Sequence, residues 1–374
     1  MKVLLIPDKF KGSLTAREVI ESISRGVLRV FPKTHVHAVQ ASDGGEGFLE
    51  CIAANVNCEV ITVDTVDALG NAIKADYLYN AKTNSAYIEL ARASGLTLLK
   101  NGHKDVMQSS TFGTGLQIKD AIAKGSTAIY VGLGGSATND AGLGIAEALG
   151  YYFLDSNGDQ LAPVGRSLSK VKSIHKASTS LSLKGISFYA VNDVDNPLYG
   201  PEGAAYTYAK QKGAGSQEMK ELDCGMEDLA NLVKLQTKKD AAKLLGAGAA
   251  GGTAYGLKVF CDAAFVSGID FVLRVSRVEE LLAENDFDYI ITGEGKFDHQ
   301  TLHGKLITGV IDLSKRFEIP VLAVCGQLDL DKKTLEQFDL LTVMEIKDRS
   351  QPLAYSLENA AILVENAVEQ FLRK

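Results

Sequence analysis

Residues 128–150 constrain the fold more than any other part of this 374-residue chain. The segment opens with an apolar, partly β-branched run, which predicts a buried strand. Glycines and small hydroxyl residues follow, and residues that favour helices come directly after them. This order predicts a strand, a tight turn and the start of a helix, which is the repeating unit of an α/β fold.

The glycines of this turn also indicate an anion site. Glycine has no Cβ atom, so the backbone at Gly134 and Gly135 can approach a ligand closely. The N–H groups and the dipole at a helix N-terminus favour a negative group such as phosphate. We therefore expect residues 134–139 to cradle a phosphate through the backbone amides between Leu133 and Asp140.

Apolar runs alternate with amphipathic stretches in the first 75 residues and again toward the C-terminus, a rhythm typical of a parallel sheet. Predicted strands cover residues 3–7, 35–41, 59–64, 187–191, 287–292, 321–324 and 340–343, and predicted helices cover 15–30, 44–54 and 352–372. Residues 75–91 instead predict an antiparallel hairpin.

We therefore predict an α/β fold of two domains. One is discontinuous, spans residues 1–75 and 265–374, and has a parallel sheet of the flavodoxin or Rossmann kind. The other is an inserted domain of residues 76–264, with a mixed sheet and the glycine-rich turn.

Composition narrows the class of protein. Apolar residues make up 46% and charged residues 23%, as in an ordinary soluble protein. The net charge of −7 argues against a nucleic-acid binder, which needs a basic face. No window approaches the roughly 20 apolar residues of a membrane span. Five scattered cysteines indicate reduced thiols. We expect a cytoplasmic protein without nucleic-acid or membrane partners.

Polar clusters follow four predicted strands, at residues 8–13, 42–47, 192–195 and 293–298. In open α/β sheets, ligands bind beyond the carboxyl ends of the strands. A capped turn would explain any one cluster, because the same residue types form turns. Four clusters in equivalent positions favour a ligand site.

The first two clusters suit an anionic, hydroxylated substrate. Lys9 and Lys11 can hold phosphate or carboxylate as point charges. Asp43 can bind substrate hydroxyls, or a metal through water, with Gly44 and Gly45 allowing close approach. The alternative is a capping box in which Ser42 or Asp43 caps the next helix and Glu46 lies near its third residue.

The last two clusters suit a metal. Asp193 and Asp195 point to the same side of an extended segment, and paired carboxylates suit Mg²⁺ or general-base work. A turn before Pro197 is the alternative. Glu294 offers a further carboxylate and Lys296 a phosphate contact. The spacing of His299 and His303 fits a zinc pair, which we disfavour because no third ligand is evident.

Two glycine patterns remain open. Residues 132–137 match G-x-G-x-x-A after a strand, which keeps an NAD-dependent hydroxyacid dehydrogenase as an alternative. Residues 246–251 match G-x-G-x-x-G but follow the charged stretch 210–245, so we expect a loop or close helix packing there. A non-catalytic ligand-binding module is the third hypothesis.

Taken in order, these motifs make the chain similar to the type 1 family of bacterial glycerate kinases over essentially its full length. The motifs are Asp8-Lys-Phe-Lys-Gly-Ser-Leu14, Asp43-Gly-Gly-Glu-Gly47, Gly132-Leu-Gly-Gly-Ser-Ala-Thr-Asn-Asp140, Asp193-Val-Asp-Asn-Pro-Leu198, Gly246-Ala-Gly-Ala-Ala-Gly-Gly252 and Ile291-Thr-Gly-Glu-Gly-Lys-Phe-Asp298. Ser42, Phe48 and His299 depart from the usual pattern beside these motifs.

The resemblance implies ATP-dependent phosphorylation of D-glycerate with Mg²⁺, in a cleft between two α/β domains. It favours 2-phosphoglycerate as product, and 3-phosphoglycerate is the alternative. A homodimer is one expectation for the assembly, and no residue decides it.

Phosphoryl transfer is mostly positioning and charge neutralisation, and the residue roles follow from that. We assign the general base to Asp193 and the metal to Asp195 and Glu294. Lys9 and Lys11 are the further catalytic candidates. Nucleotide phosphates are assigned to Gly134, Gly135, Ser136, Thr138 and Asn139, and glycerate to Asp43, Gly44, Gly45 and Glu46.

Overall fold

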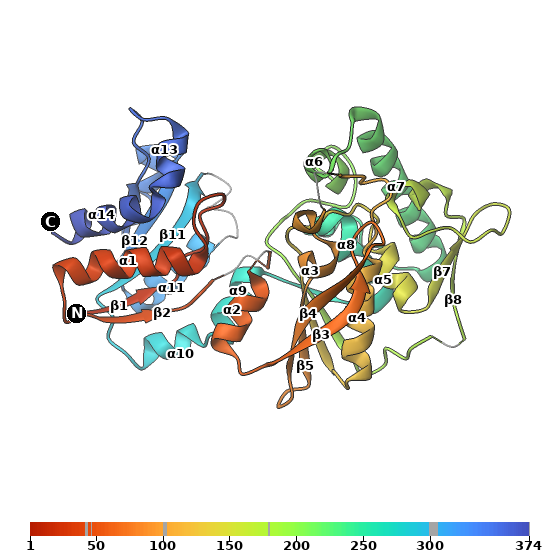
Figure 1. The fold of residues 1–374 in the computed structure, drawn as a ribbon, viewed down its shortest axis with the longest axis horizontal. Coiled ribbons are helices and arrows are strands. Elements are labelled where there is room, and N and C mark those ends of the chain that lie inside the picture. Colours follow the sequence, from red (N-terminus) through yellow and green to blue (C-terminus); the bar gives the residue numbers. More distant parts are fainter. Residues whose placement is uncertain (42–43, 46, 100–102, 179, 299–305, 374) are drawn as a thin grey trace. The chain divides into compact units, whose positions relative to one another are not determined.

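The computed structural model describes residues 1–41, 44–45, 47–99, 103–178, 180–298 and 306–373. The chain divides into two compact units (Figure 1). The first unit comprises Met1–Asp43 and Ile269–Lys374, and the second unit comprises Gly44–Gly268. None of the helices in these ranges is long and apolar enough to cross a membrane.

The first unit is built on a five-stranded parallel sheet in the order β13-β12-β11-β1-β2. Its strands are β1 (Lys2–Leu5), β2 (His35–Ala38), β11 (Tyr289–Phe297), β12 (Val321–Leu328) and β13 (Leu341–Glu345). Its helices are α1 (Ala16–Val30), α10 (Val278–Ala283), α11 (Leu306–Phe317), α12 (Lys332–Leu335), α13 (Leu353–Glu358) and α14 (Ala360–Leu372), and α9 (Gly268–Val275) begins at the division. The predicted parallel sheet is confirmed.

Helix α1 shows how the sequence directs this unit. Thr15 caps the helix by accepting a hydrogen bond from the Glu18 N–H, and the Glu18 carboxylate accepts one from the Thr15 N–H, so both groups satisfy amides that the helix leaves unpaired. Apolar residues spaced along one face, such as Val19 and Val27, are fully buried. They pack in one cluster with Val364 of α14, so the two helices cover the sheet together.

The second unit holds a six-stranded mixed sheet in the order β10-β9-β6-β5-β4-β3. Its strands are β3 (Glu59–Val66), β4 (Ala72–Asn80), β5 (Ser85–Glu89), β6 (Ala128–Gly132), β9 (Ser187–Val191) and β10 (Ala264–Val266). A separate ribbon pairs β7 (Tyr151–Leu154) with β8 (Ser173–Lys176). The predicted mixed sheet is confirmed, with β3–β4–β5 antiparallel and the remaining pairs parallel.

Helices and short 3-10 turns complete the second unit. They are α2 (Phe48–Asn55), α3 (Ala91–Ser94), α4 (Phe112–Ala123), α5 (Leu143–Ala148), α6 (Ala204–Tyr208), α7 (Ser216–Thr237), α8 (Ala249–Cys261), η1 (Leu96–Leu98), η3 (Gly165–Lys170) and η4 (Lys210–Lys212). Across the parallel strands, Tyr130 stacks between Tyr87 and Tyr189, with ring centroids 5.3 and 4.4 Å away.

The division between the units differs from the predicted boundary near residue 75. β3, expected in the parallel sheet, pairs antiparallel with β4 over eight positions and belongs to the second unit. The cause is the short turn between them, where Asp67 accepts hydrogen bonds from the Leu69 and Asn71 amides. The first division therefore follows Asp43, and the second follows Gly268 rather than residue 264.

Candidate functional site

The carboxyl ends of the parallel strands in the second unit lie at one edge of its sheet. Register pairs Glu89 with Gly132, Gly132 with Val191, and Val191 with Val266, so four strands end side by side. The segments that leave β6 and β9 stay in contact, because the Leu133 N–H donates to the Val191 carbonyl at 3.0 Å. This edge is where ligands bind in α/β sheets, and it carries several of the predicted site residues.

The glycine-rich loop, residues 133–140, packs directly against a second predicted motif. The Gly134 N–H donates to the Gly44 carbonyl at 3.2 Å. A Cβ atom on Gly134 would overlap the Cα atom of Gly45, so only glycine fits there. Gly135 has a left-handed φ of +67°, which also favours glycine. The structure thus brings together Gly44, Gly45, Gly134 and Gly135 from the predicted set.

The loop leads into helix α5, as the predicted order of strand, turn and helix requires, but an aspartate of the chain already binds amides at the start of that helix. Helix α5 begins only at Leu143. Asp140, which is fully buried, already occupies the helix start, because its carboxylate accepts hydrogen bonds from the Gly142 and Gly144 amides. The same carboxylate accepts from the backbone and hydroxyl of Thr111, both at 2.7 Å. An aspartate therefore fills the place that the helix dipole would offer a phosphate.

Several amides of the loop already donate hydrogen bonds to backbone carbonyls of this chain. Besides Leu133 and Gly134, the Ala137 N–H donates to the Ser94 carbonyl at 2.9 Å. The expectation that amides throughout residues 133–140 bind phosphate is therefore wrong for these three. The amides of Gly135, Ser136, Thr138 and Asn139 are not among those bonded to a backbone carbonyl in the described part of the chain, and the loop also carries the side chains of Ser136, Thr138 and Asn139.

Lys212 is a site residue that the sequence analysis missed. It ends the short turn η4 and is 2% exposed. Its Nζ donates to Ser136 Oγ at 2.7 Å, the Thr138 carbonyl at 2.6 Å and Asn139 Oδ1 at 3.2 Å. Burial lowers the pKa of Lys212 to about 7, and the charge of Asp140 opposes that shift. The sequence gives no signal for it, because a lysine within a charged stretch is normally exposed.

Glu89 is a second residue of this edge that was missed. It ends β5, is 2% exposed, and its Oε2 accepts a hydrogen bond from the Leu49 N–H at 3.2 Å. Its other oxygen lies 3.7 Å from Arg92 Nε. The rule applied to the other strands, a polar residue where a buried strand ends, would have identified it.

Asp193 and Asp195 follow β9 at the same edge but differ in environment. The Asp193 Oδ1 accepts hydrogen bonds from Ser267 Oγ at 2.9 Å and the Gly268 N–H at 2.8 Å, where α9 begins. Asp195 is exposed. Asp193 is thus held in one orientation, and Asp195 is open to solvent or a ligand.

The remaining described candidates belong to the first unit. Lys9 is half-buried and Lys11 exposed in the segment after β1, which hydrogen-bonds to β11 through the Asp8 N–H and the Gly293 carbonyl at 2.9 Å. Glu294 lies within β11, opposite Cys325 of β12, whereas the sequence analysis placed it after the strand. β11 is longer than predicted because its pairing with β12 continues as far as Phe297.

Lys296, predicted to contact phosphate, also lies within β11. Its Nζ is 3.1 Å from an Asp298 oxygen and 3.0 Å from an Asp329 oxygen, so two carboxylates share this lysine at the surface. Asp43, Glu46, His299 and His303 lie outside the described residues. α2 begins at Phe48 after Gly47, so the alternative in which Ser42 or Asp43 caps this helix is wrong.

The second glycine pattern packs against the glycine-rich loop. The Ala141 N–H donates to the Gly251 carbonyl at 3.1 Å, and a Cβ atom on Gly251 would overlap the Thr138 carbonyl. Close packing, one of the two predicted roles for residues 246–251, is therefore what the structure shows. This pattern supports the shape of the loop.

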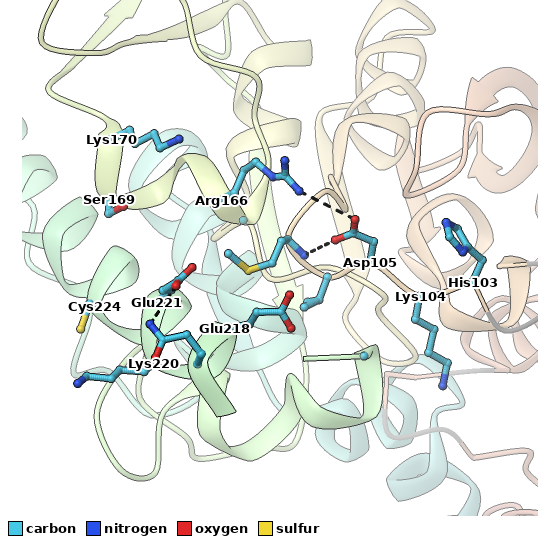
Figure 2. Close-up of a pocket in the computed structure, with 15 residues that line it drawn as sticks. His103, Lys104, Asp105, Arg166, Ser169, Lys170, Glu218, Lys220, Glu221 and Cys224 are labelled. Carbon is cyan, nitrogen blue, oxygen red and sulfur yellow. Dashed lines mark hydrogen bonds and ion pairs between the residues drawn. The ribbon is translucent and has the colours of Figure 1, made fainter. Parts of the chain in front are cut away.

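A cavity of about 800 Å³ opens in the second unit beside this region (Figure 2). Residues from 103–107, 165–170 and 213–224 line it, and none of the predicted site residues does. In Figure 2 the side chains of Arg166 and Asp105 point toward one another, with 4.0 Å between Nη2 and Oδ2. Its Gly213 directly follows Lys212, so the wall of the cavity adjoins the loop.

The chain is similar to known proteins over nearly its full length. The model of the Glycerate kinase family matches residues 3–374. A glycerate kinase of Halalkalibacterium halodurans is 34% identical over 98% of this chain and 96% of its own length. The glycerate 2-kinase of Escherichia coli is 35% identical over 92% of this chain and 90% of its own.

A solved structure agrees with the sequence comparison. The crystal structure from Salmonella typhimurium LT2 named as a glycerate kinase 2 superposes with a TM-score of 0.79 at 33% identity, and the match covers 100% of this chain and 98% of that one.

Proposed function

The chain belongs to the glycerate kinase family, and from this premise we propose that it transfers the γ-phosphoryl group of ATP to a hydroxyl group of D-glycerate. The observation that carries the proposal is the family match over residues 3–374. The enzyme is a phosphotransferase with an alcohol as acceptor, and 2-phosphoglycerate is the product we favour over 3-phosphoglycerate.

The nucleotide phosphates are proposed to meet the side chains of the glycine-rich loop. Phosphoryl transfer needs positioned donors and cations rather than covalent work by the protein. Ser136, Thr138 and Asn139 offer hydroxyl and amide groups at the carboxyl edge of the sheet, and the buried ammonium of Lys212 touches all three residues. Gly134 and Gly135 act by allowing the tight packing that shapes the loop.

Mg²⁺ is proposed as the metal, with Asp195 and Glu294 each a candidate carboxylate ligand. The donor chemistry fits, because Mg²⁺ takes one or two carboxylates and completes its shell with phosphate oxygens and water. Among the described residues no group of three or more His, Cys, Asp or Glu side chains that could hold a metal ion occurs. When bound, the ion would neutralise charge on the phosphates.

Asp193 is the proposed general base for the glycerate hydroxyl. The bonds from Ser267 and Gly268 fix its orientation, as proton transfer requires. Lys9, Lys11, Asp43, Gly44, Gly45 and Glu46 are proposed to contact glycerate. A cytoplasmic location and a homodimer are further expectations.

The dehydrogenase alternative is not favoured. The G-x-G-x-x-A reading needs a helix directly after the turn, with its N-terminus open to a pyrophosphate. Here α5 starts six residues beyond Ala137 and its first amides are bound by Asp140.

One assay tests the function. The purified chain is incubated with ATP, MgCl₂ and D-glycerate, and ADP release is followed against a control without glycerate. We expect glycerate-dependent ADP, and phosphorus NMR of the product should show 2-phosphoglycerate. Glycerate-dependent reduction of NAD⁺ without ADP release would contradict the proposal.

A further inference from the structure

Lys212 carries a charge in a place where few proteins bury one. All three acceptors of its ammonium, Ser136 Oγ, the Thr138 carbonyl and Asn139 Oδ1, belong to one short segment and none is charged. A buried ammonium is stabilised well only when a counter-ion contacts it. Asp140 is the charged group that acts on it, but that carboxylate is occupied by Thr111, Gly142 and Gly144.

The segment that Lys212 holds has buried polar atoms still to be satisfied. Thr138 Oγ1 and Asn139 Nδ2 have no hydrogen-bond partner among the described residues. Both residues are 0% exposed. A hydroxyl and an amide N–H₂ both donate hydrogen bonds. Two donors in residues 136–139 and the under-compensated cation bonded to that segment match an anionic oxygen, since charge-assisted hydrogen bonds are the strongest that such groups form.

We propose that Lys212 is a positioning residue that holds Ser136, Thr138 and Asn139 for the phosphate oxygens of ATP, with Thr138 and Asn139 as donors to them. This inference rests on the proposed function. It adds Lys212, which the sequence analysis did not contain, and it names the side-chain groups of Thr138 and Asn139 as the donors at two positions already assigned to the nucleotide phosphates. The structural alternative is that Lys212 only fastens the loop, without consequence for the nucleotide.

Thr138→Val separates these two roles most sharply. Valine matches threonine in shape, and the hydroxyl that it removes makes no hydrogen bond among the described residues. We therefore expect the melting temperature of the free protein to stay the same or rise. ADP affinity, measured by calorimetry on the intact protein, should fall about ten- to a hundredfold, because a lost hydrogen bond to a charged group is worth about 1.5–3 kcal/mol.

Lys212→Met is the companion variant. We expect at least a tenfold rise in the ADP dissociation constant and in the KM for ATP, with the KM for glycerate changed less than threefold. Lys210→Met is the matched control, since it removes the same charge from an exposed position in the same turn. It should bind ADP like the wild type.

Three outcomes distinguish a failure of this proposal from a failure of the proposed function. If Thr138→Val and a folded Lys212→Met both bind ADP like the wild type, the proposal is overturned while glycerate phosphorylation by the wild type still supports the function. If Thr138→Val lowers the melting temperature and leaves ADP affinity unchanged, the hydroxyl is structural and the proposal fails. If the wild type binds ADP but phosphorylates no glycerate, the function fails, and the two variants still test the loop.

Discussion

The two sheets place polar residues at their carboxyl edges in opposite ways. In the second unit Asp140, Asn139 and Lys212 are buried and hydrogen-bonded within the chain, Lys212 to Asn139 and Asp140 to backbone amides, although Asp195 at the same edge is exposed. In the first unit the polar residues lie at the surface, where Lys11 is exposed and the Lys296 side chain is 51% exposed between two aspartates. We call the carboxyl edge of the second unit's sheet the fixed edge and that of the first unit's sheet the open edge. Substitutions should affect both folding and activity at the fixed edge, but activity alone at the open edge.

Asp193→Asn should give the largest effect and tests whether the fixed edge carries the chemistry. A general base contributes roughly 10²–10⁴-fold to the rate, so kcat should fall by that factor. Ser267→Ala is the matched control, since it removes one hydrogen bond to Asp193 but keeps the carboxylate. A kcat for Asp193→Asn within about threefold of the wild type would remove Asp193 as the base.

Asp140→Asn tests whether a substitution at the fixed edge lowers the stability of the fold. The change removes the charge that compensates Lys212 and turns an amide N–H₂ toward backbone donors. Breaking one partner of a buried charged network costs about 3–5 kcal/mol, so the free energy of unfolding in urea should fall by that amount. Asp329→Asn, at the open edge, should leave it nearly unchanged. Equal losses in the two variants would abolish the distinction.

Gly134→Ala probes the contact between the two glycine motifs. The added Cβ overlaps Gly45, and overpacking of this kind costs about 1–3 kcal/mol of unfolding free energy. The control is Gly215→Ala, because a Cβ there meets its nearest atom, on the Glu218 side chain, at 3.8 Å. An unchanged melting temperature for Gly134→Ala would show that the loop can move away from Gly45.

Lys11→Ala examines the open edge. Because the side chain is exposed, the melting temperature should stay at the wild-type value. If Lys11 contacts the carboxylate of glycerate, the KM for glycerate should rise roughly tenfold, as expected for one hydrogen bond to a charged group. Thermal unfolding and steady-state kinetics on the same preparation measure both. A loss of stability would place Lys11 with the fixed residues.

A last expected effect is on the pH dependence of stability. The pKa of Lys212 is lowered from its usual value of 10.5 to about 7 in the folded chain, so above pH 7 the unfolded chain binds more protons at this group. Stability should therefore increase as pH rises from about 7 toward 10.5. Lys212→Met should lack this increase. Parallel slopes for the two proteins would show that Lys212 keeps an ordinary pKa.

The sequence predicted the fold where its signals were local. Apolar periodicity identified α1 and β9, and the strand-end rule pointed to the loop after β6 and to Asp193. It could not predict that β3 joins the second unit, because an apolar run does not reveal its pairing partner. Nor could it predict that Asp140 also binds the backbone and hydroxyl of Thr111, which is distant in sequence.

Lys212 marks the limit of what composition can reveal. A lysine among charged residues is usually exposed, and only the tertiary fold shows that this one is buried against residues 136–139. Glu89 marks the opposite case, because its place at the end of a buried strand was readable and the hairpin interpretation hid it.

The stacked Tyr87, Tyr130 and Tyr189 belong to a set of tyrosines that lie almost entirely in the second unit, so the two units differ in their ultraviolet signal. The chain has no tryptophan, and of its 13 tyrosines only Tyr289 and Tyr355 belong to the first unit. Near-ultraviolet absorbance and intrinsic emission therefore report almost entirely on the domain that holds the loop. A chemist can follow the melting of that domain in the whole enzyme without attaching a dye.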